Sequence, residues 1–264
     1  TAPTAGTAFF CIVLGTALGV GVPADGTVSG SKLSSPFNYN SGLLYLDTTN
    51  NRIGIGTTTP LVKLQVGGTI GFNDTNIKLG NSATGCSITT GTNNFFAGVG
   101  AGQFTTTGSN NNFIGQCAGY SNTTGQYNNF FGFKAGVNNT TGNNNTFIGR
   151  YAGLSNTTCG NNTFIGQSAG RCNTGGDVNI FIGSCAGYSN TTGYGNVFLG
   201  PGTGKNGPGT GNFNNFVGFY AGRDNTSGTN NNFLGYYAGR VNTTGSYNNF
   251  FGRFAGSANT TGNN

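Results

Sequence analysis

Residues 161–193 read NNTFIGQSAGRCNTGGDVNIFIGSCAGYSNTTG, and the second half of this stretch nearly repeats the first. Phe164 and Phe181 are each followed by Ile-Gly, two variable residues and Ala-Gly, with a stride of 17 residues. A short fixed period predicts a stacked array, because one unit of this size cannot bury its apolar face alone. The repetition therefore indicates a structural pattern and not a catalytic signature.

The same motif occurs ten times, with steps of 17 residues except for one of 18 between Phe198 and Phe216. The phenylalanines are Phe96, Phe113, Phe130, Phe147, Phe164, Phe181, Phe198, Phe216, Phe233 and Phe250. Two residues before each of them stands an asparagine, namely Asn94, Asn111, Asn128, Asn145, Asn162, Asn179, Asn196, Asn214, Asn231 and Asn248. Glycine follows two residues after every Phe, and Ala-Gly completes nine of the ten copies, with Thr203-Gly204 in the other.

These columns predict an all-β fold, a β-solenoid of about ten 17-residue coils over residues 94–264. Gly and β-favouring aromatic residues argue against helical repeats. We expect a short strand at Asn-x-Phe-Ile-Gly, a second extended piece at Ala-Gly and a turn at Asn-Thr-Thr-Gly. Coils stacked at about 4.8 Å would rise roughly 48 Å over the array. In such a stack the Phe column fills the core, and the Asn column forms an amide ladder.

The residue after each Phe is apolar in all ten copies. Neighbouring residues on a strand point to opposite faces, so this second column faces outward if Phe faces inward. An exposed apolar stripe marks an interface, and self-association about an axis parallel to the stack would let every coil meet its copy. A wider, bulged coil that encloses both columns is the alternative. Ala97, Phe131 and Phe251 belong to this column, and the interface that we predict consists of Ile114, Ile148, Ile165, Ile182, Leu199, Val217 and Leu234.

The composition excludes most catalytic chemistry. Only 6% of the 264 residues are charged, 51 are Gly, and His, Met, Trp and Glu are absent. Without His or Glu there is no Ser-His-Asp triad, no Cys-His pair and no histidine metal site. The five acidic residues are widely spaced aspartates. We therefore expect neither an enzyme nor a bound cofactor or metal.

The net charge of +6 reflects a scarcity of acids and not a basic block, because Lys and Arg occur singly. A protein that binds nucleic acid usually has a denser cluster of Lys and Arg, so no nucleic-acid partner is expected. Six cysteines allow disulfides, but they lack metal-site spacing, and free, mostly buried thiols are the preferred interpretation. Cys117 and Cys185 share a coil position but lie four coils apart, about 19 Å, which is too far for a disulfide within one chain.

Residues 1–93 precede the ten aligned repeats and have a different sequence pattern. The apolar run from Ala8 to Val22 is about 15 residues, too short for a comfortable membrane span, and suggests a buried strand pair. We expect residues 1–22 to form an assembly segment that covers the terminal coil of another protomer, which would allow head-to-tail assembly. Residues 23–93 are expected to hold small β-units. Among them, GLLYLDTTNNRIGIG predicts a hairpin with Asp47 to Asn51 in its turn, and LVKLQVGGTI at residues 61–70 alternates as a strand does.

Three parts of the chain resemble two known families. NRIGIGTTTPLVKLQVGGTI at residues 51–70 is similar to a GIGTTxPxxKLxVxG stretch of trimeric phage tail fibres, and VPADGTVSGSKL at residues 22–33 is similar to linkers of the same proteins. The repeats resemble the β-roll heads of trimeric autotransporter adhesins, whose coils are shorter and carry Val-Ala-Ile-Gly. These resemblances imply an elongated, parallel homotrimeric fibre exposed on a virion or cell surface, and a virion tail or capsid fibre is the preferred interpretation.

The resulting expectation is a structural shaft that spaces or presents receptor-binding parts. Its partners would be other copies of the chain, further virion or surface proteins and a host glycan receptor. The alternative is a bacterial surface adhesin or a self-assembling filament, either extracellular or on the cell surface. A third class is a glycan-binding or ice-binding solenoid, which needs a regular exposed column of Thr or aromatic residues.

Three further motifs have simpler explanations. GPGTGKNGPGTG at residues 200–211 suggests a phosphate loop, but its glycine spacing departs from that pattern and Asn206 follows Lys205, so a bulged coil is preferred. Asn-Thr-Thr occurs six times as a formal glycosylation acceptor, yet a turn explains the period. The seventh position after Phe carries Tyr120, Arg171, Tyr188, Lys205, Arg223 and Arg240, which form either a solvated face or a surface for anionic glycans.

Overall fold

The computed structural model describes residues 75–81, 83–207 and 209–263, together with four short strands before them. The chain divides into two compact units, Thr1–Phe72 and Asn73–Asn264, and each is described by itself. Every regular element in the described residues is a β-strand, so the all-β class is confirmed. The same residues contain no helix that is long and apolar enough to cross a membrane. The apolar segment at residues 1–22 lies outside the described residues.

The first unit contains a four-stranded sheet in the order β1-β2-β3-β4. Its strands are β1 (Phe37–Tyr39), β2 (Leu44–Asp47), β3 (Arg52–Ile55) and β4 (Leu64–Val66). β2 and β3 pair antiparallel, which confirms the predicted hairpin, but Asp47 lies in β2 opposite Arg52 and not in the turn as expected. β4 falls inside the alternating stretch at residues 61–70 and runs parallel to β3.

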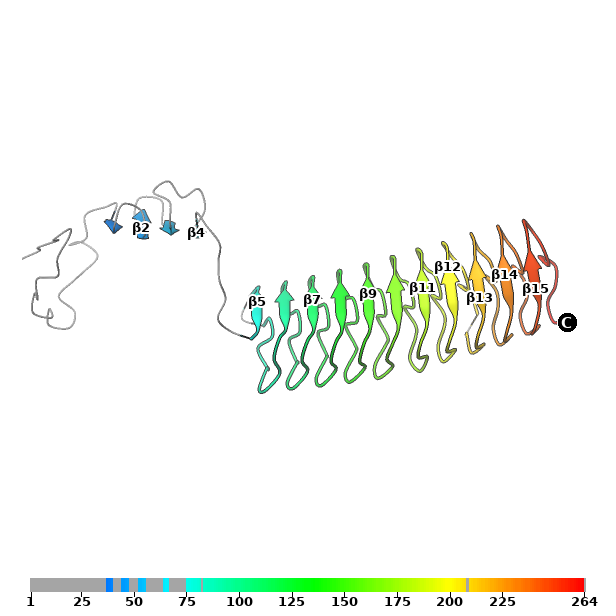
Figure 1. Cartoon of the computed structure of the whole chain (residues 1–264), viewed down its shortest axis with the longest axis horizontal. Coiled ribbons are helices and arrows are strands. Elements are labelled where there is room, and N and C mark those ends of the chain that lie inside the picture. Colours follow the sequence, from blue (N-terminus) through cyan, green and yellow to red (C-terminus); the bar gives the residue numbers. More distant parts are fainter. Residues whose placement is uncertain are drawn as a thin grey trace, which may run out of the picture. The chain divides into compact units, whose positions relative to one another are not determined.

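The second unit is the solenoid, whose strands lie side by side as a row of arrows from β5 to β15 (Figure 1). They are β5 (Ile77–Leu79), β6 (Phe95–Ala97), β7 (Asn112–Ile114), β8 (Asn129–Phe131), β9 (Thr146–Ile148), β10 (Thr163–Ile165), β11 (Ile180–Ile182), β12 (Val197–Leu199), β13 (Asn215–Val217), β14 (Asn232–Leu234) and β15 (Asn249–Phe251). All neighbours pair in parallel, and Phe164 lies opposite both Phe147 and Phe181. This in-register stack confirms the predicted β-solenoid. The extra residue between Phe198 and Phe216 leaves the pairing of those two residues intact.

The solenoid begins one coil earlier than residue 94, where the sequence placed its start. β5 pairs with β6, and Lys78 stands opposite Phe96. Asn76 occupies the place of the repeated asparagine, since its Oδ1 accepts a hydrogen bond from the backbone N–H of Asn94 at 3.0 Å. The coil was missed because Lys78 replaces the phenylalanine on which the repeats were aligned.

The interior of each coil is small and is filled by few residue types. Phe, the alanine five residues after it and two asparagines point inward, and in the central coils these side chains are fully buried. Because so little volume separates the walls, the glycine after each alanine lies against the Phe ring: a Cβ on Gly170 would come within 2.5 Å of the Phe164 ring. The repeat therefore has Ala and Gly at the positions that pack against the Phe ring.

Candidate functional surfaces

The ten repeat phenylalanines form one continuous stack inside the solenoid. Successive ring centroids lie 4.7–5.0 Å apart with interplanar angles of at most 14°. Nine of the ten are buried, and Phe250 in the final described coil is partly buried. Rings at this spacing are in van der Waals contact over their faces. This column supplies the apolar core of the rod.

The asparagine two residues before each Phe is buried and bonds mainly to backbone groups. Asn145 is typical: its Oδ1 accepts from the backbone N–H of Asn162 at 3.0 Å, and its Nδ2 donates to the carbonyl of Cys159 at 2.8 Å. The expected amide–amide ladder therefore describes this column only in part. Towards the C-terminal coils, Nδ2 also approaches the preceding Oδ1, at 3.2 Å between Asn196 and Asn179. These side chains satisfy backbone groups that the short strands leave without partners.

A second asparagine column, nine residues after Phe, forms the amide ladder in two runs, Asn122 to Asn190 and Asn225 to Asn259, because Gly207 takes this position in the coil between them. Asn139 Nδ2 donates to Asn122 Oδ1 at 2.9 Å, and Asn156 Nδ2 donates to Asn139 Oδ1 at the same distance. Each amide also bonds the carbonyl three residues on, which is Gly142 for Asn139. The sequence had assigned this asparagine to a turn. Its burial argues against the glycosylation alternative, because a glycan would have to displace the ladder.

The second apolar column lies on the outside of the coil, so the bulged alternative with both columns inside is wrong. Ile114 and Leu234 are 40% and 48% exposed, and Phe251 is 65% exposed. Ile148, Ile165, Leu199 and Val217 are half-buried by their neighbours in the stack, and Ile182 is exposed. The result is an apolar seam on the strand face, formed by Ile114, Ile148, Ile165, Ile182, Leu199, Val217 and Leu234.

The glycine-rich loop at residues 200–211 is part of the stack and not a phosphate cradle. The backbone N–H groups of Gly200 and Gly202 donate to the carbonyls of Ile182 and Ser184 in the preceding coil, at 2.8 and 2.9 Å. A phosphate-binding loop needs such groups free to point at the ligand. The bulged-coil interpretation therefore fits these residues.

The five described cysteines are free thiols, but the expectation that they are mostly buried is wrong. Only Cys159 is buried; Cys86 is exposed, and Cys117, Cys172 and Cys185 are half-buried. Cys117 and Cys185 stand in the outward turn after the strand, where both adopt a left-handed backbone with φ of 55° and 56°. Burial, above all, raises the pKa of the Cys159 thiol. Cys11 lies outside the described residues.

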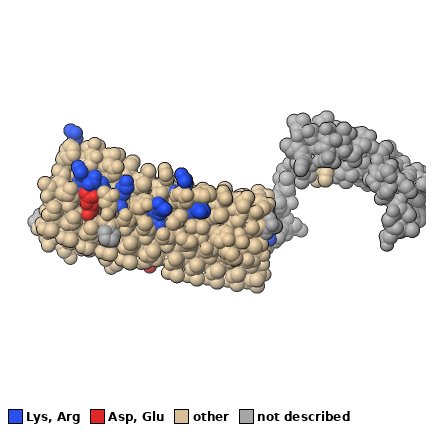
Figure 2. All heavy atoms as spheres, turned by 180° about the vertical axis from the view of Figure 1, so that it is seen from behind, with Lys and Arg blue, Asp and Glu red and all other residues tan. Residues whose placement is uncertain are grey.

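Positively charged residues gather on one face of the solenoid, as Figure 2 shows. They stand three, four or seven residues after the repeat phenylalanine, and they are Lys134, Arg150, Arg171, Lys205, Arg223, Arg240 and Arg253. Aromatic side chains from the same turns lie between them. The guanidinium of Arg171, for example, lies 5.4 Å from the ring centroid of Tyr151 and 5.5 Å from that of Tyr188. We call these seven side chains the cation row.

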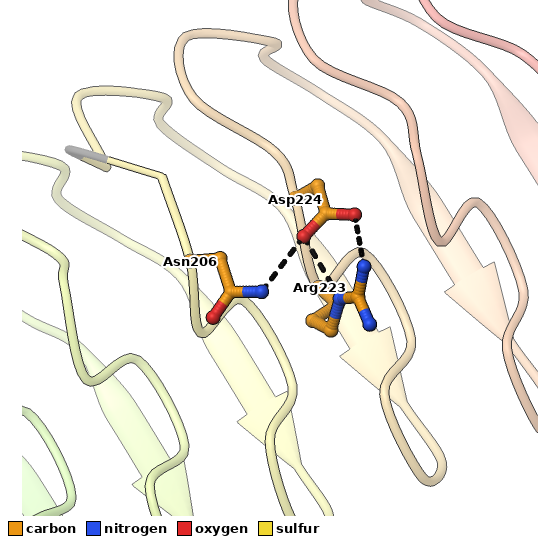
Figure 3. A network of polar contacts seen from close by, with 3 residues as sticks. All are labelled: Asn206, Arg223 and Asp224. Carbon is orange, nitrogen blue, oxygen red and sulfur yellow. Dashed lines mark hydrogen bonds and ion pairs between the residues drawn. The ribbon is translucent and has the colours of Figure 1, made fainter.

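One member of the cation row is paired within the chain. Arg223 donates from Nε and Nη2 to the two carboxylate oxygens of Asp224, at 2.8 and 2.6 Å, and Asn206 donates to the same carboxylate at 2.9 Å (Figure 3). Burial opposes ionisation of Asp224, but the hydrogen bonds from Arg223 and Asn206 outweigh it. The pKa of this carboxyl therefore lies below its ordinary value.

The described residues contain no group of three or more His, Cys, Asp or Glu side chains placed to hold a metal ion. The features that the structure does bring together are a filled core, an apolar seam and a cation row. Searches against protein-family models, curated proteins and solved structures find no match for this chain.

Proposed function

We propose that the protein is a structural fibre component, an elongated shaft that spaces or presents receptor-binding parts. The observation that carries this proposal is the unbroken in-register stack from β5 to β15. Ten strand spacings of about 4.8 Å give a rod of roughly 48 Å. Most coils contact the next through backbone hydrogen bonds, a Phe ring and two asparagines, so bending the rod would strain all of these contacts together.

The apolar seam supports self-association of this shaft. It runs the length of the stack and carries no charged residue, and a seam parallel to the rod axis lets copies meet coil by coil. Burial of this exposed apolar surface between copies would contribute about 25 cal/mol per Å² to the free energy of association. The trimeric state and the place on a virion surface rest on the resemblance of residues 51–70 to tail-fibre sequence. A bacterial adhesin or extracellular filament would use the same rod and seam.

The test is the native mass of the protein and of a variant in its seam. Ile165→Asp places a charge in the middle of the seam, and we expect it to lower the mass from that of a trimer to that of a single chain. The circular dichroism spectrum should keep its β-sheet signal, since Ile165 lies outside the coil. Mass photometry or analytical ultracentrifugation reads the outcome.

The matched control is Thr141→Asp, which adds the same charge at an exposed turn position away from the seam. We expect this variant to keep the wild-type mass. A monomeric wild type, or equal masses for Ile165→Asp and wild type, would show that the seam does not join copies of the chain.

A further inference from the structure

The cation row is regular along the rod. Its seven members occupy seven of eight consecutive coils, from the coil of Phe130 to that of Phe250, and the coil of Phe181 alone contributes none. Seven coil spacings separate Lys134 from Arg253, roughly 34 Å at ordinary strand spacing. The charges therefore recur about once per coil along one face of the rod, at three different positions of the repeat.

Six of the seven cations in this row lie against aromatic side chains, and Lys205 is the exception among the contacts found. Arg150 lies 4.7 Å from the ring centroid of Tyr151, Arg240 lies 5.1 Å from that of Tyr237, and Lys134 lies 5.4 Å from that of Phe133. The rings also pack on one another: the centroids of Tyr220 and Tyr237 are 5.5 Å apart. Such cation–π contacts position the charged groups before a ligand arrives, which lowers the ordering cost of binding.

Little acidic charge opposes the row. The described part of the solenoid has two acidic side chains, and only Asp224 stands among the cations, where it pairs with Arg223. The other, Asp177, lies on a different edge and accepts from the backbone N–H of Gly160 at 2.7 Å. The field at the row also acts on Tyr151: a hydrogen bond from Arg150 is the largest influence that lowers its pKa, and the charges of Lys134 and Arg171 act in the same direction.

We propose that the cation row binds a linear acidic polysaccharide, a polyuronate with one carboxylate on each sugar, laid along the rod axis. Each sugar of an extended uronate chain advances by about the distance between adjacent coils, so the carboxylates recur along the rod at the same interval as the cations, with the coil of Phe181 left without a cation. Arg is the cation best suited to carboxylates, because its planar group donates two parallel hydrogen bonds. Five of the seven cations in the row are arginines.

The geometry favours this ligand over nucleic acid. Double-stranded DNA carries one charge per about 1.7 Å of its axis, far denser than one cation per coil. Single strands are bound through aromatic rings free to stack on bases. In the cation row, the ring faces of Tyr151 and Tyr237 already lie against Arg150 and Arg240. The rings of Tyr236 and Phe254 are partly exposed beside Arg253, so the spacing of the charges is the feature that favours a uronate chain.

The experiment measures binding of fluorescently labelled oligogalacturonates of about four, eight and twelve sugars to the full chain in low salt. Affinity should rise from four to eight sugars and then level, because the row spans eight coils. Added salt should weaken binding, and the methyl-esterified octamer, which has the same sugars without their charge, should not bind. Arg171→Gln combined with Arg240→Gln should weaken binding of the octamer about fivefold or more.

Lys78→Gln is the control, because it removes a positive charge in the first coil, outside the row; its affinity should match the wild type. Circular dichroism checks that all variants keep the fold. The proposal is overturned if the esterified octamer binds equally well, or if the row variant binds like Lys78→Gln. It is equally overturned if single-stranded DNA or anionic phospholipid vesicles bind more tightly than the octamer under the same conditions.

Discussion

Phe164 shows what a single residue contributes to this rod. Its side chain is fully buried, and the ring centroids of Phe147 and Phe181 each lie 4.9 Å from its own. Phe164→Ala should lower the free energy of unfolding by about 3–5 kcal/mol per chain, because the cavity lies between backbone walls that cannot close over it. Chemical denaturation followed by circular dichroism measures this change.

Phe104→Ala is the matched control for that substitution. Phe104 is 43% exposed and contacts Tyr120 edge-on, with 5.0 Å between their ring centroids. Its removal leaves no buried cavity, so we expect a loss of about 1 kcal/mol or less. Equal losses for Phe104→Ala and Phe164→Ala would mean that the stacked column is not the core of the fold.

At the scale of the repeated element, neighbouring asparagines have opposite roles. Asn139 is buried, donates to Asn122 and Gly142, and accepts from Asn156. Asn139→Ala leaves Oδ1 of Asn122 and one N–H of the Asn156 amide without a partner in the interior, at about 1–3 kcal/mol for each. The Gly142 carbonyl still accepts from Asn128 at 2.8 Å. Asn138→Ala, one residue earlier on the exposed side, should change the free energy of unfolding by less than about 0.5 kcal/mol. Thermal melts of both variants compare them directly.

The stride predicted the strand and its pairing from sequence alone, but the second extended piece expected at Ala-Gly is a turn. Parallel stacking puts equal positions above each other, so the Phe period already implied the pairing of Phe164 with Phe181. The amide ladder was predicted for the column two residues before Phe, where it forms only in part, because both asparagine columns recur with the same period. The two asparagine columns differ in the distance between side chains of adjacent coils, and the sequence does not give that distance. The first coil had a readable signal, since Asn76 and Gly80 keep the repeat spacing around Lys78.

The cation row was predicted only at the seventh position after Phe. Lys134, Arg150 and Arg253 stand at other positions of the repeat and join the row because the turn after each strand is left-handed. Lys134 and Tyr151 have φ of 54° and 61°, a conformation that non-glycine residues seldom adopt. The sequence pattern does not predict this left-handed turn. The structure was therefore needed to show that Lys134, Arg150 and Arg253 lie on the same face as the other cations.

At the scale of the whole molecule, stability should depend on contacts between adjacent coils, as in other stacked repeat proteins. The glycine two residues after each Phe controls how closely those coils approach. Gly166 has φ of +132°, and a Cβ added there would lie 2.5 Å from the carbonyl oxygen of Gly183 in the next coil. Any side chain at this position therefore has to push two coils apart.

Gly166→Ala should accordingly divide the rod between β10 and β11. We expect a loss of about 3 kcal/mol or more in the free energy of unfolding. We also expect faster hydrogen exchange of the Gly183 amide, which donates to the Ile165 carbonyl across that boundary at 2.8 Å. Gly252→Ala is the control, because Gly252 has φ of +117° but no atom within 4 Å of an added Cβ, so it carries the backbone strain without the clash. If the two variants lose equal stability, backbone conformation alone demands the glycine. A larger loss of stability for Gly166→Ala would mean that close contact between adjacent coils requires glycine at this position. The stability of the rod would then depend on that contact between coils.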